Sequence, residues 1–219
     1  MRQAIEAYET LVFDCDGVVL NSNRIKTDAF YQAASPYGEA AAQALVDYHV
    51  QNGGISRYKK FAHFLKNLVA PSQVGPTLDE LLSSYAAKVH EGLMSCDIAE
   101  GLVALRECTA NARWLIVSGG DQAELREVFA VRGLSELFDG GIFGSPDNKD
   151  DILARLQENV TIQQPALFLG DSKYDHQATS AAGLDFIFLS GWSEVSDWEA
   201  WVTDMGLSHL RSIQDLVEG

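Results

Sequence analysis

Apolar and polar positions alternate in blocks along this chain. From about residue 98 onward, short runs of aromatic, β-branched and leucine residues are followed by stretches in which apolar residues recur every three or four positions. Short apolar runs are typical of buried strands, and the longer periodic stretches are typical of helices that cover a sheet. The expected strands are 11–13, 114–117, 141–143, 166–169 and 186–189, and the expected helices between them are 122–132, 150–159 and 174–182. This order predicts an α/β fold with a doubly wound, Rossmann-like, mostly parallel sheet.

The segment between Gly17 and about Cys96 has a different pattern. It is helical throughout, with Phe, Leu and Tyr recurring at helical spacing, and it is punctuated by Gly53-Gly54 and by a proline-containing stretch at 71–76. Four helices without a strand do not belong inside a sheet. We therefore expect an inserted all-helical cap domain at 20–96, and an α/β core domain made of 1–19 and 97–219. The alternative interpretation is a separate helical domain that takes no part in the site.

Composition and charge exclude several classes of partner. The chain has 219 residues and a formal net charge of −15, which argues against a nucleic-acid or anionic-membrane surface. The three cysteines are few and widely spaced, and form neither a disulfide framework nor a Cys-x-x-Cys metal site. No secretory leader is evident, and no apolar stretch approaches the length of a membrane span. We expect a cytoplasmic protein that is a monomer or a homodimer.

Two carboxylates, Asp14 and Asp16, follow the first expected strand at once and precede Gly17. Ligands of open α/β sheets bind at the carboxyl ends of the strands. Residues two apart in an extended chain point the same way, so the two carboxylates converge unless the turn at Gly17 separates them. Like charges that converge need a cation or a shared proton, and a divalent metal supplies the first. The competing interpretation is an ordinary surface turn; an EF-hand is a poor fit.

Three further polar signals fall at or just beyond expected strand ends. Ser118 and Gly119 offer a hydroxyl and backbone N–H groups at a helix start, which is an anion cradle or an ordinary helix cap. Lys149 opens a helix, where its charge opposes the helix dipole, so that a nearby anion or plain solvation would explain it. Asp171 and Asp175 form a second acidic pair, whose spacing would place them on one face of a helix.

The order of these signals is more specific than any one of them. Asp-x-Asp-Gly, then Ser, then Lys, then Gly-Asp-x-x-x-Asp, each near a strand end, strongly resembles the haloacid dehalogenase-like (HAD) superfamily of phosphohydrolases. The motifs span 14–175, and the helical insertion stands where that superfamily places its cap. The small helical cap is similar to that of the phosphoglycolate phosphatase and β-phosphoglucomutase-like members.

The resemblance implies a role for each motif residue. Asp14 matches the nucleophile that attacks phosphorus and forms an aspartyl-phosphate, and Asp16 matches the general acid/base. Ser118 and Lys149 match the groups that hold the transferring phosphoryl oxygens. Such positioning and charge neutralisation are what phosphoryl transfer requires.

The resemblance also implies a Mg²⁺ cofactor. Asp14, Asp171 and the backbone carbonyl of Asp16 match its ligands, and Asp175 matches a second acidic position that ligates through water or fixes the site. Mg²⁺ prefers oxygen ligands and retains waters, which suits an all-aspartate site shared with a phosphate.

The cap is expected to select the substrate. The loop 52–57 is the best candidate element, and Arg57 or Lys60 would reach an anionic or hydroxyl-rich leaving group. The alternative is that both are solvated charges on a helix face. Phosphonatases of this superfamily form an imine with a cap lysine; Lys59, Lys60 and Lys66 keep that option open, and no feature favours one of them. The five histidines do not cluster in the sequence, so none is assigned to catalysis.

We therefore expect a Mg²⁺-dependent phosphatase that hydrolyses a small phosphorylated metabolite through an aspartyl-phosphate. A phosphomutase of the β-phosphoglucomutase type is the nearest alternative. Two others are a phospho-aspartate signalling module similar to a receiver domain, and an inactive binding protein on the same fold. The acid at Asp16 and the helical cap count against the receiver-like module, and the intact motif residues count against the inactive protein.

Overall fold

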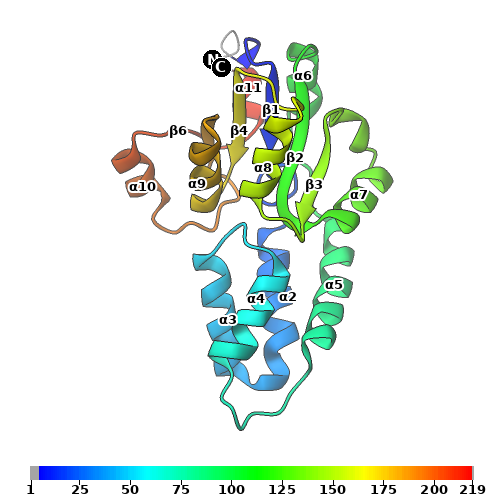
Figure 1. The fold of residues 1–219 in the computed structure, drawn as a ribbon, viewed down its shortest axis with the longest axis vertical. Helices are drawn as coiled ribbons and strands as arrows, with labels where there is room; N and C mark the ends of the chain where they lie inside the picture. The colour runs from blue at the N-terminus through cyan, green and yellow to red at the C-terminus, as the bar shows by residue number, and fades with distance from the viewer. Residues whose placement is uncertain (1–4, 219) are drawn as a thin grey trace.

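A single parallel sheet organises the computed structural model, which describes residues 5–218 (Figure 1). The strand order is β3-β2-β1-β4-β5-β6, and every pair of neighbouring strands is parallel. The strands are β1 (Thr10–Phe13), β2 (Arg113–Asp121), β3 (Gly141–Ser145), β4 (Ala166–Gly170), β5 (Asp185–Leu189) and β6 (Ser208–Leu210). The five predicted strands are confirmed; the short edge strand β6 was not predicted.

Alternate residues of the central strands face opposite layers of helix, because side chains of a strand alternate across the sheet. Phe13 and Trp114 pack on one face, and Val12 and Leu115 pack on the other. Buried residues of α6, α7 and α11 belong to the first layer, and buried residues of α8 and α9 belong to the second. Both faces of the sheet are covered, as expected for central strands that carry consecutive apolar residues such as 11–13 and 114–117.

The helices of this layered core follow the expected order. They are α6 (Leu102–Cys108), α7 (Gln122–Val131), α8 (Lys149–Glu158), α9 (Lys173–Ala182), α10 (Trp198–Met205) and α11 (Gln214–Glu218), with a 3₁₀ turn η3 (Ser135–Leu137). The predicted helices 122–132, 150–159 and 174–182 correspond to α7, α8 and α9 within one residue at each end. The short helices α6 and α11 were not predicted. No helix in the described part of the chain combines the length and apolar character that crossing a bilayer needs.

The helices of the insertion lie together at the carboxyl end of the sheet, and α11 lies at the opposite end of the molecule (Figure 1). We call them the cap helices. They are α2 (Asn23–Ala34), α3 (Glu39–Gln51), α4 (Arg57–His63) and α5 (Leu78–Ser95), with short turns η1 (Ser35–Tyr37) and η2 (Phe64–Leu68) between them. Phe30, Phe61 and Tyr85 of these helices belong to the same apolar cluster as Phe13, so the cap packs directly onto the core.

The two chain segments that join the cap helices to the sheet pair with each other. Leu20 and Ile98 form an antiparallel bridge, flanked by a hydrogen bond from the N–H of Asn21 to the carbonyl of Asp97 at 3.0 Å. This pairing lies where the sequence predicts the domain boundary. The division into 1–19 with 97–219 and 20–96 stays a prediction, and residues 1–4 and 219 lie outside the described part of the chain.

Candidate active site

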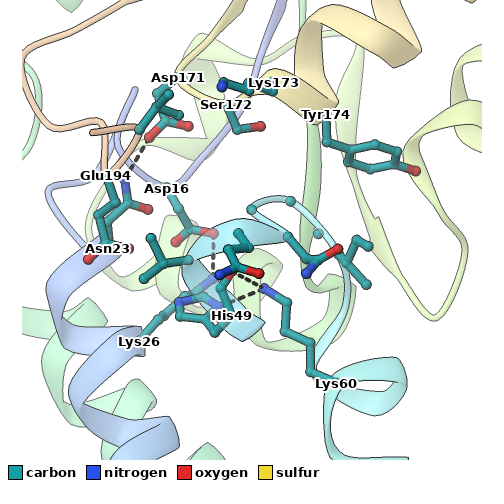
Figure 2. A pocket seen from close by; sticks show the side chains of 18 of the residues that line it. Asp16, Asn23, Lys26, His49, Lys60, Asp171, Ser172, Lys173, Tyr174 and Glu194 are labelled. Carbon is teal, nitrogen blue, oxygen red and sulfur yellow. Dashed lines mark hydrogen bonds and ion pairs between the residues drawn. The ribbon is translucent and has the colours of Figure 1, made fainter. Parts of the chain in front are cut away.

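A cavity of about 440 Å³ lies between the carboxyl ends of the strands and the cap helices. Motif residues Asp14, Asp16 and Asp171 line it on the sheet side, and cap residues Arg57 and Lys60 line it on the other. Figure 2 shows Asp16 and Asp171 above the amines of the cap side. The cap therefore takes part in forming the cavity, and the interpretation of a helical domain with no role in the site is wrong.

Asp14 lies directly beyond β1, where its carboxylate meets Lys149. Its Oδ2 lies 2.8 Å from the Lys149 Nζ, and its Oδ1 accepts the backbone N–H of Cys15 at 2.7 Å. Asp14 is only 4 % exposed and Lys149 is fully buried, so neither the surface turn nor the solvated lysine is correct. Burial raises the pKa of Asp14 to about 7, against the opposing charge of Lys149.

Asp175 is fixed by a capping box at the start of α9. Its Oδ2 accepts the hydroxyl and N–H of Ser172 at 2.7 and 3.1 Å, and the N–H of Asp171 at 3.2 Å. Its Oδ1 accepts from Lys149. Because these bonds occupy the carboxylate, the geometry favours the predicted role of fixing the site over direct ligation.

Asp171 reaches toward the loop after β1. Its Oδ2 accepts from the amide of Asn23 at 2.6 Å. A Cβ at Gly17, which has a φ of +72°, would overlap the same oxygen, so only glycine leaves room for it. Burial, followed by the charges of Asp14 and Asp175, raises the pKa of Asp171 well above its usual value.

Asp16 points away from these three carboxylates. Its Oδ1 accepts the hydroxyl of Ser22 at 2.6 Å, and its Oδ2 forms an ion pair with Lys26 of α2. Burial would raise the pKa of Asp16, but Lys26 and Ser22 outweigh burial, so the pKa lies below its usual value. The two motif carboxylates do not converge, because the chain turns at Gly17. Ligation through the backbone carbonyl of Asp16 stays a prediction.

The segment after β2 brings backbone groups to the cavity. Gly119 and Gly120 line it, whereas Ser118 is fully buried behind them and its Oγ accepts the N–H of Gly120 at 3.0 Å. A Cβ at Gly120 would lie 3.3 Å from both the Ser118 hydroxyl and the Lys26 amine. The serine of the second motif therefore lies at the same edge of the sheet as Lys26 and its partner Asp16.

The cap cations Arg57 and Lys60 are both buried, 7 % and 1 % exposed, so the interpretation as solvated helix-face charges is wrong. Arg57 forms an ion pair with Glu124 of α7, which links the cap to the core. The Lys60 amine contacts the Nδ1 atom of His49 at 2.6 Å (Figure 2). Of these two residues, only Lys60 has no carboxylate partner among the described residues.

The carboxylates can hold a divalent metal. Asp14, Asp171 and Asp175 each have a carboxylate oxygen within 4.8 Å of the others, and because the bonds that Asp175 makes occupy its carboxylate, Asp14 and Asp171 are the candidates for direct ligation. Together with Asp16, these are four carboxylates against the two lysines Lys26 and Lys149 that pair with three of them, which leaves a charge of −2 when all are ionised. An all-oxygen donor set with that excess charge fits Mg²⁺.

The comparisons with known proteins agree with this geometry. The family model described as haloacid dehalogenase-like hydrolase matches residues 11–189. The chain belongs to this family. The fold class and the resemblance inferred from the motifs are thereby confirmed, and a hydrolase is favoured over the receiver-like module.

Solved structures show the same fold. CbbY from Rhodobacter sphaeroides, in complex with phosphate, is 19 % identical with a TM-score of 0.70, over 95 % of this chain and 96 % of that one. A protein from Lactobacillus plantarum, provisionally described as a phosphoglycolate phosphatase, is 20 % identical with a TM-score of 0.71, over 96 % and 98 %. A protein from Thermotoga maritima, provisionally described as a β-phosphoglucomutase, is 16 % identical with a TM-score of 0.65, over 96 % and 97 %. No curated protein matches the chain in sequence.

Sequence reasoning missed several residues of the cavity. Asn23 and Lys26 contact Asp171 and Asp16, and their spacing of three on α2 was the available signal. Glu194 lines the cavity from the segment after β5, where its carboxylate accepts from Thr27 at 3.0 Å. Nothing in the sequence indicates this partner, which is 167 residues away.

Proposed function

We propose that this protein is a Mg²⁺-dependent phosphatase that hydrolyses a small phosphomonoester through an aspartyl-phosphate on Asp14. The observation that carries the proposal is the position of the Asp14 carboxylate, which lies in the cavity beyond β1, paired with Lys149 and within 4.8 Å of oxygens of Asp171 and Asp175. The cytoplasm as its location, and a monomer or homodimer as its assembly, stay predictions.

In the first step a carboxylate oxygen of Asp14 attacks phosphorus, and the bond from phosphorus to the leaving oxygen breaks. Asp16 gives its proton to that oxygen, which leaves as an alcohol. In the second step water attacks the phosphoryl group, Asp16 takes a proton from the water, and the bond to Asp14 breaks. The ion pair with Lys26 lowers the pKa of Asp16 and so favours the carboxylate, the form that acts as the base of this second step.

The transferring oxygens need positive charge and hydrogen-bond donors. Ser118 is assigned as one donor: its oxygen accepts from Gly120, so its hydroxyl hydrogen is left to donate, although the residue is buried behind the glycines that line the cavity. The buried cation of Lys149 opposes charge build-up beside Asp14. Mg²⁺, when bound by Asp14 and Asp171, would neutralise the phosphate and reduce its repulsion of the nucleophile. Asp175 holds Lys149 and the backbone of Asp171 in place.

A phosphomonoester screen with and without Mg²⁺ tests the proposal. Wild-type protein should release phosphate only with the metal, and Asp14→Asn should abolish release. Asp79→Asn, an exposed aspartate on α5, is the matched control and should retain full activity. Comparable release by Asp14→Asn would remove Asp14 from its role. Isomerised sugar phosphate with little free phosphate would instead favour the phosphomutase.

A further inference from the structure

Lys60 is a buried cation that lacks an anion. Four lysine or arginine side chains of the described chain are buried, and three of them, Lys26, Arg57 and Lys149, form ion pairs with carboxylates. No carboxylate of residues 5–218 lies within ion-pair distance of the Lys60 amine, although the residue is 1 % exposed. An unpaired charge is costly to bury, so we expect Lys60 to meet an anionic partner when a ligand is bound.

The second unusual group is His49, which holds the amine. Its Nδ1 lies 2.6 Å from the Lys60 Nζ, and its backbone oxygen accepts from the same amine at 3.4 Å. Its Nε2 is buried and has no hydrogen-bond partner within the described residues. When the lysine is protonated it donates to Nδ1, so the hydrogen of the neutral imidazole is on Nε2. The Lys60 amine and the His49 Nε2–H group are thus two donors on the cap side of the cavity whose hydrogen-bonding capacity is not fully used.

The charged groups around this pair already have partners of their own. Figure 2 shows the Lys60 amine reaching from α4 toward His49 of α3, with Lys26 and Asp16 beyond it. The charged groups that face the amine are Lys26 of α2, Asp16 after β1, Lys149 of α8 and Glu194 after β5. Lys26, Asp16 and Lys149 are already in ion pairs, and Glu194 is held by Thr27.

We propose that Lys60, held by His49, binds a second anionic group, a carboxylate or a second phosphate, on the alcohol portion of the phosphomonoester. The inference rests on the proposed function and names its substrate class. The Lys60–His49 pair is a specificity-determining site, which gives no advantage to a substrate whose alcohol portion is uncharged. Burial and the charge of Lys26 lower the pKa of Lys60 to about 7, and an incoming anion would raise it again.

A binding experiment separates this inference from the phosphatase activity. Asp14→Asn protein with Mg²⁺ is titrated calorimetrically with alkyl phosphates whose far end is a methyl group, a carboxylate or a second phosphate. Each series is made with chains of two to five carbons. At pH 7 we expect an anionic-ended ligand to bind about tenfold or more tightly than the methyl-ended ligand of equal length, as for one charge-assisted hydrogen bond.

Two further variants, built on Asp14→Asn, assign the effect to Lys60. Lys60→Met should abolish the preference, whereas Lys59→Met, its exposed neighbour, should retain it. Equal binding of both ligand types at every length, or a preference that survives Lys60→Met, would overturn the proposal. A failure of wild-type protein to release phosphate would instead overturn the phosphatase function, because the titration needs no turnover.

A second readout needs no substitution at Lys60, in case the methionine variant does not fold. At pH 8, titrations in buffers of different ionisation enthalpy should show more proton uptake for the anionic-ended ligand than for its methyl-ended partner. The comparison cancels the protons that the shared phosphate exchanges with Asp16, Lys26, Lys149 and Glu194. Equal proton uptake on binding the two ligands would contradict the inference that the anionic end causes Lys60 to bind a proton.

Discussion

The Lys26 amine forms an ion pair with the Asp16 carboxylate and so connects the first cap helix to the proposed general acid. This contact ties the protonation of Asp16 to the position of α2. Because Asp16 must be protonated when the leaving group departs and ionised when water attacks, the lysine favours the second step over the first.

Lys26→Met should move the pH profile of kcat/KM for an alkyl phosphate toward higher pH. Without the lysine the pKa of Asp16 rises, because the adjacent opposite charge is lost. A para-nitrophenyl phosphate needs little protonation of its leaving group, so its profile should shift less. The exposed Lys66→Met is the control. Profiles that shift equally for both substrates would argue against Asp16 as the acid.

Mg²⁺ should stabilise the protein more at pH 8 than at pH 5. The folded-state pKa of Asp14 is raised from 3.8 to about 7, and that of Asp171 is also raised. When the pKa of a carboxyl group is higher in the folded than in the unfolded state, its contribution to stability is fully present at pH values below the unfolded-state pKa. That contribution is lost as the pH rises through the folded-state pKa. Mg²⁺ offsets this loss of stability only at pH values at which Asp14 and Asp171 are ionised. Thermal unfolding with and without Mg²⁺ measures it; an equal shift in melting temperature at both pH values would exclude this linkage.

Arg57→Ala and Glu124→Ala should raise KM by similar factors, and the double variant should be little worse than either. The ion pair joins α4 to α7, so each substitution removes the same buried contact between cap and core. A coupling of about 1–3 kcal/mol is expected for such a charge-assisted pair. Glu127→Ala, exposed on the same helix, is the control. Additive effects in kcat/KM would show that the two residues act independently.

Gly119→Ala should weaken substrate binding strongly. A Cβ at Gly119 would overlap the backbone carbonyl of Gly54, so the cap loop would have to move away from the cavity. Gly53→Ala is a milder test of the same loop, because its Cβ would lie 3.2 Å from the Cβ of Ser172. Steady-state kinetics should show the larger rise in KM for Gly119→Ala. A larger rise in KM for Gly53→Ala would mean that the contact between Gly119 and Gly54 does not determine the shape of the cavity.

The sequence predicted the strand and helix order well, because apolar runs and helical periodicity are local properties. It also predicted that Asp14, Lys149 and Asp171 would share one edge, since parallel strands end on the same side of a sheet. The short elements α6, β6 and α11 escaped prediction because their patterns are too brief to stand out from loops.

What the sequence by itself determined is which chemical groups this protein brings to the carboxyl edge of its sheet. Only the tertiary structure decided what each group touches. It turned Asp16 toward Lys26, buried Lys149 between two aspartates and paired Arg57 with Glu124. It also left Lys60 with His49 as its partner. The physical reason is that a buried charge is governed by neighbours distant in sequence, and no local pattern records which of them will pair.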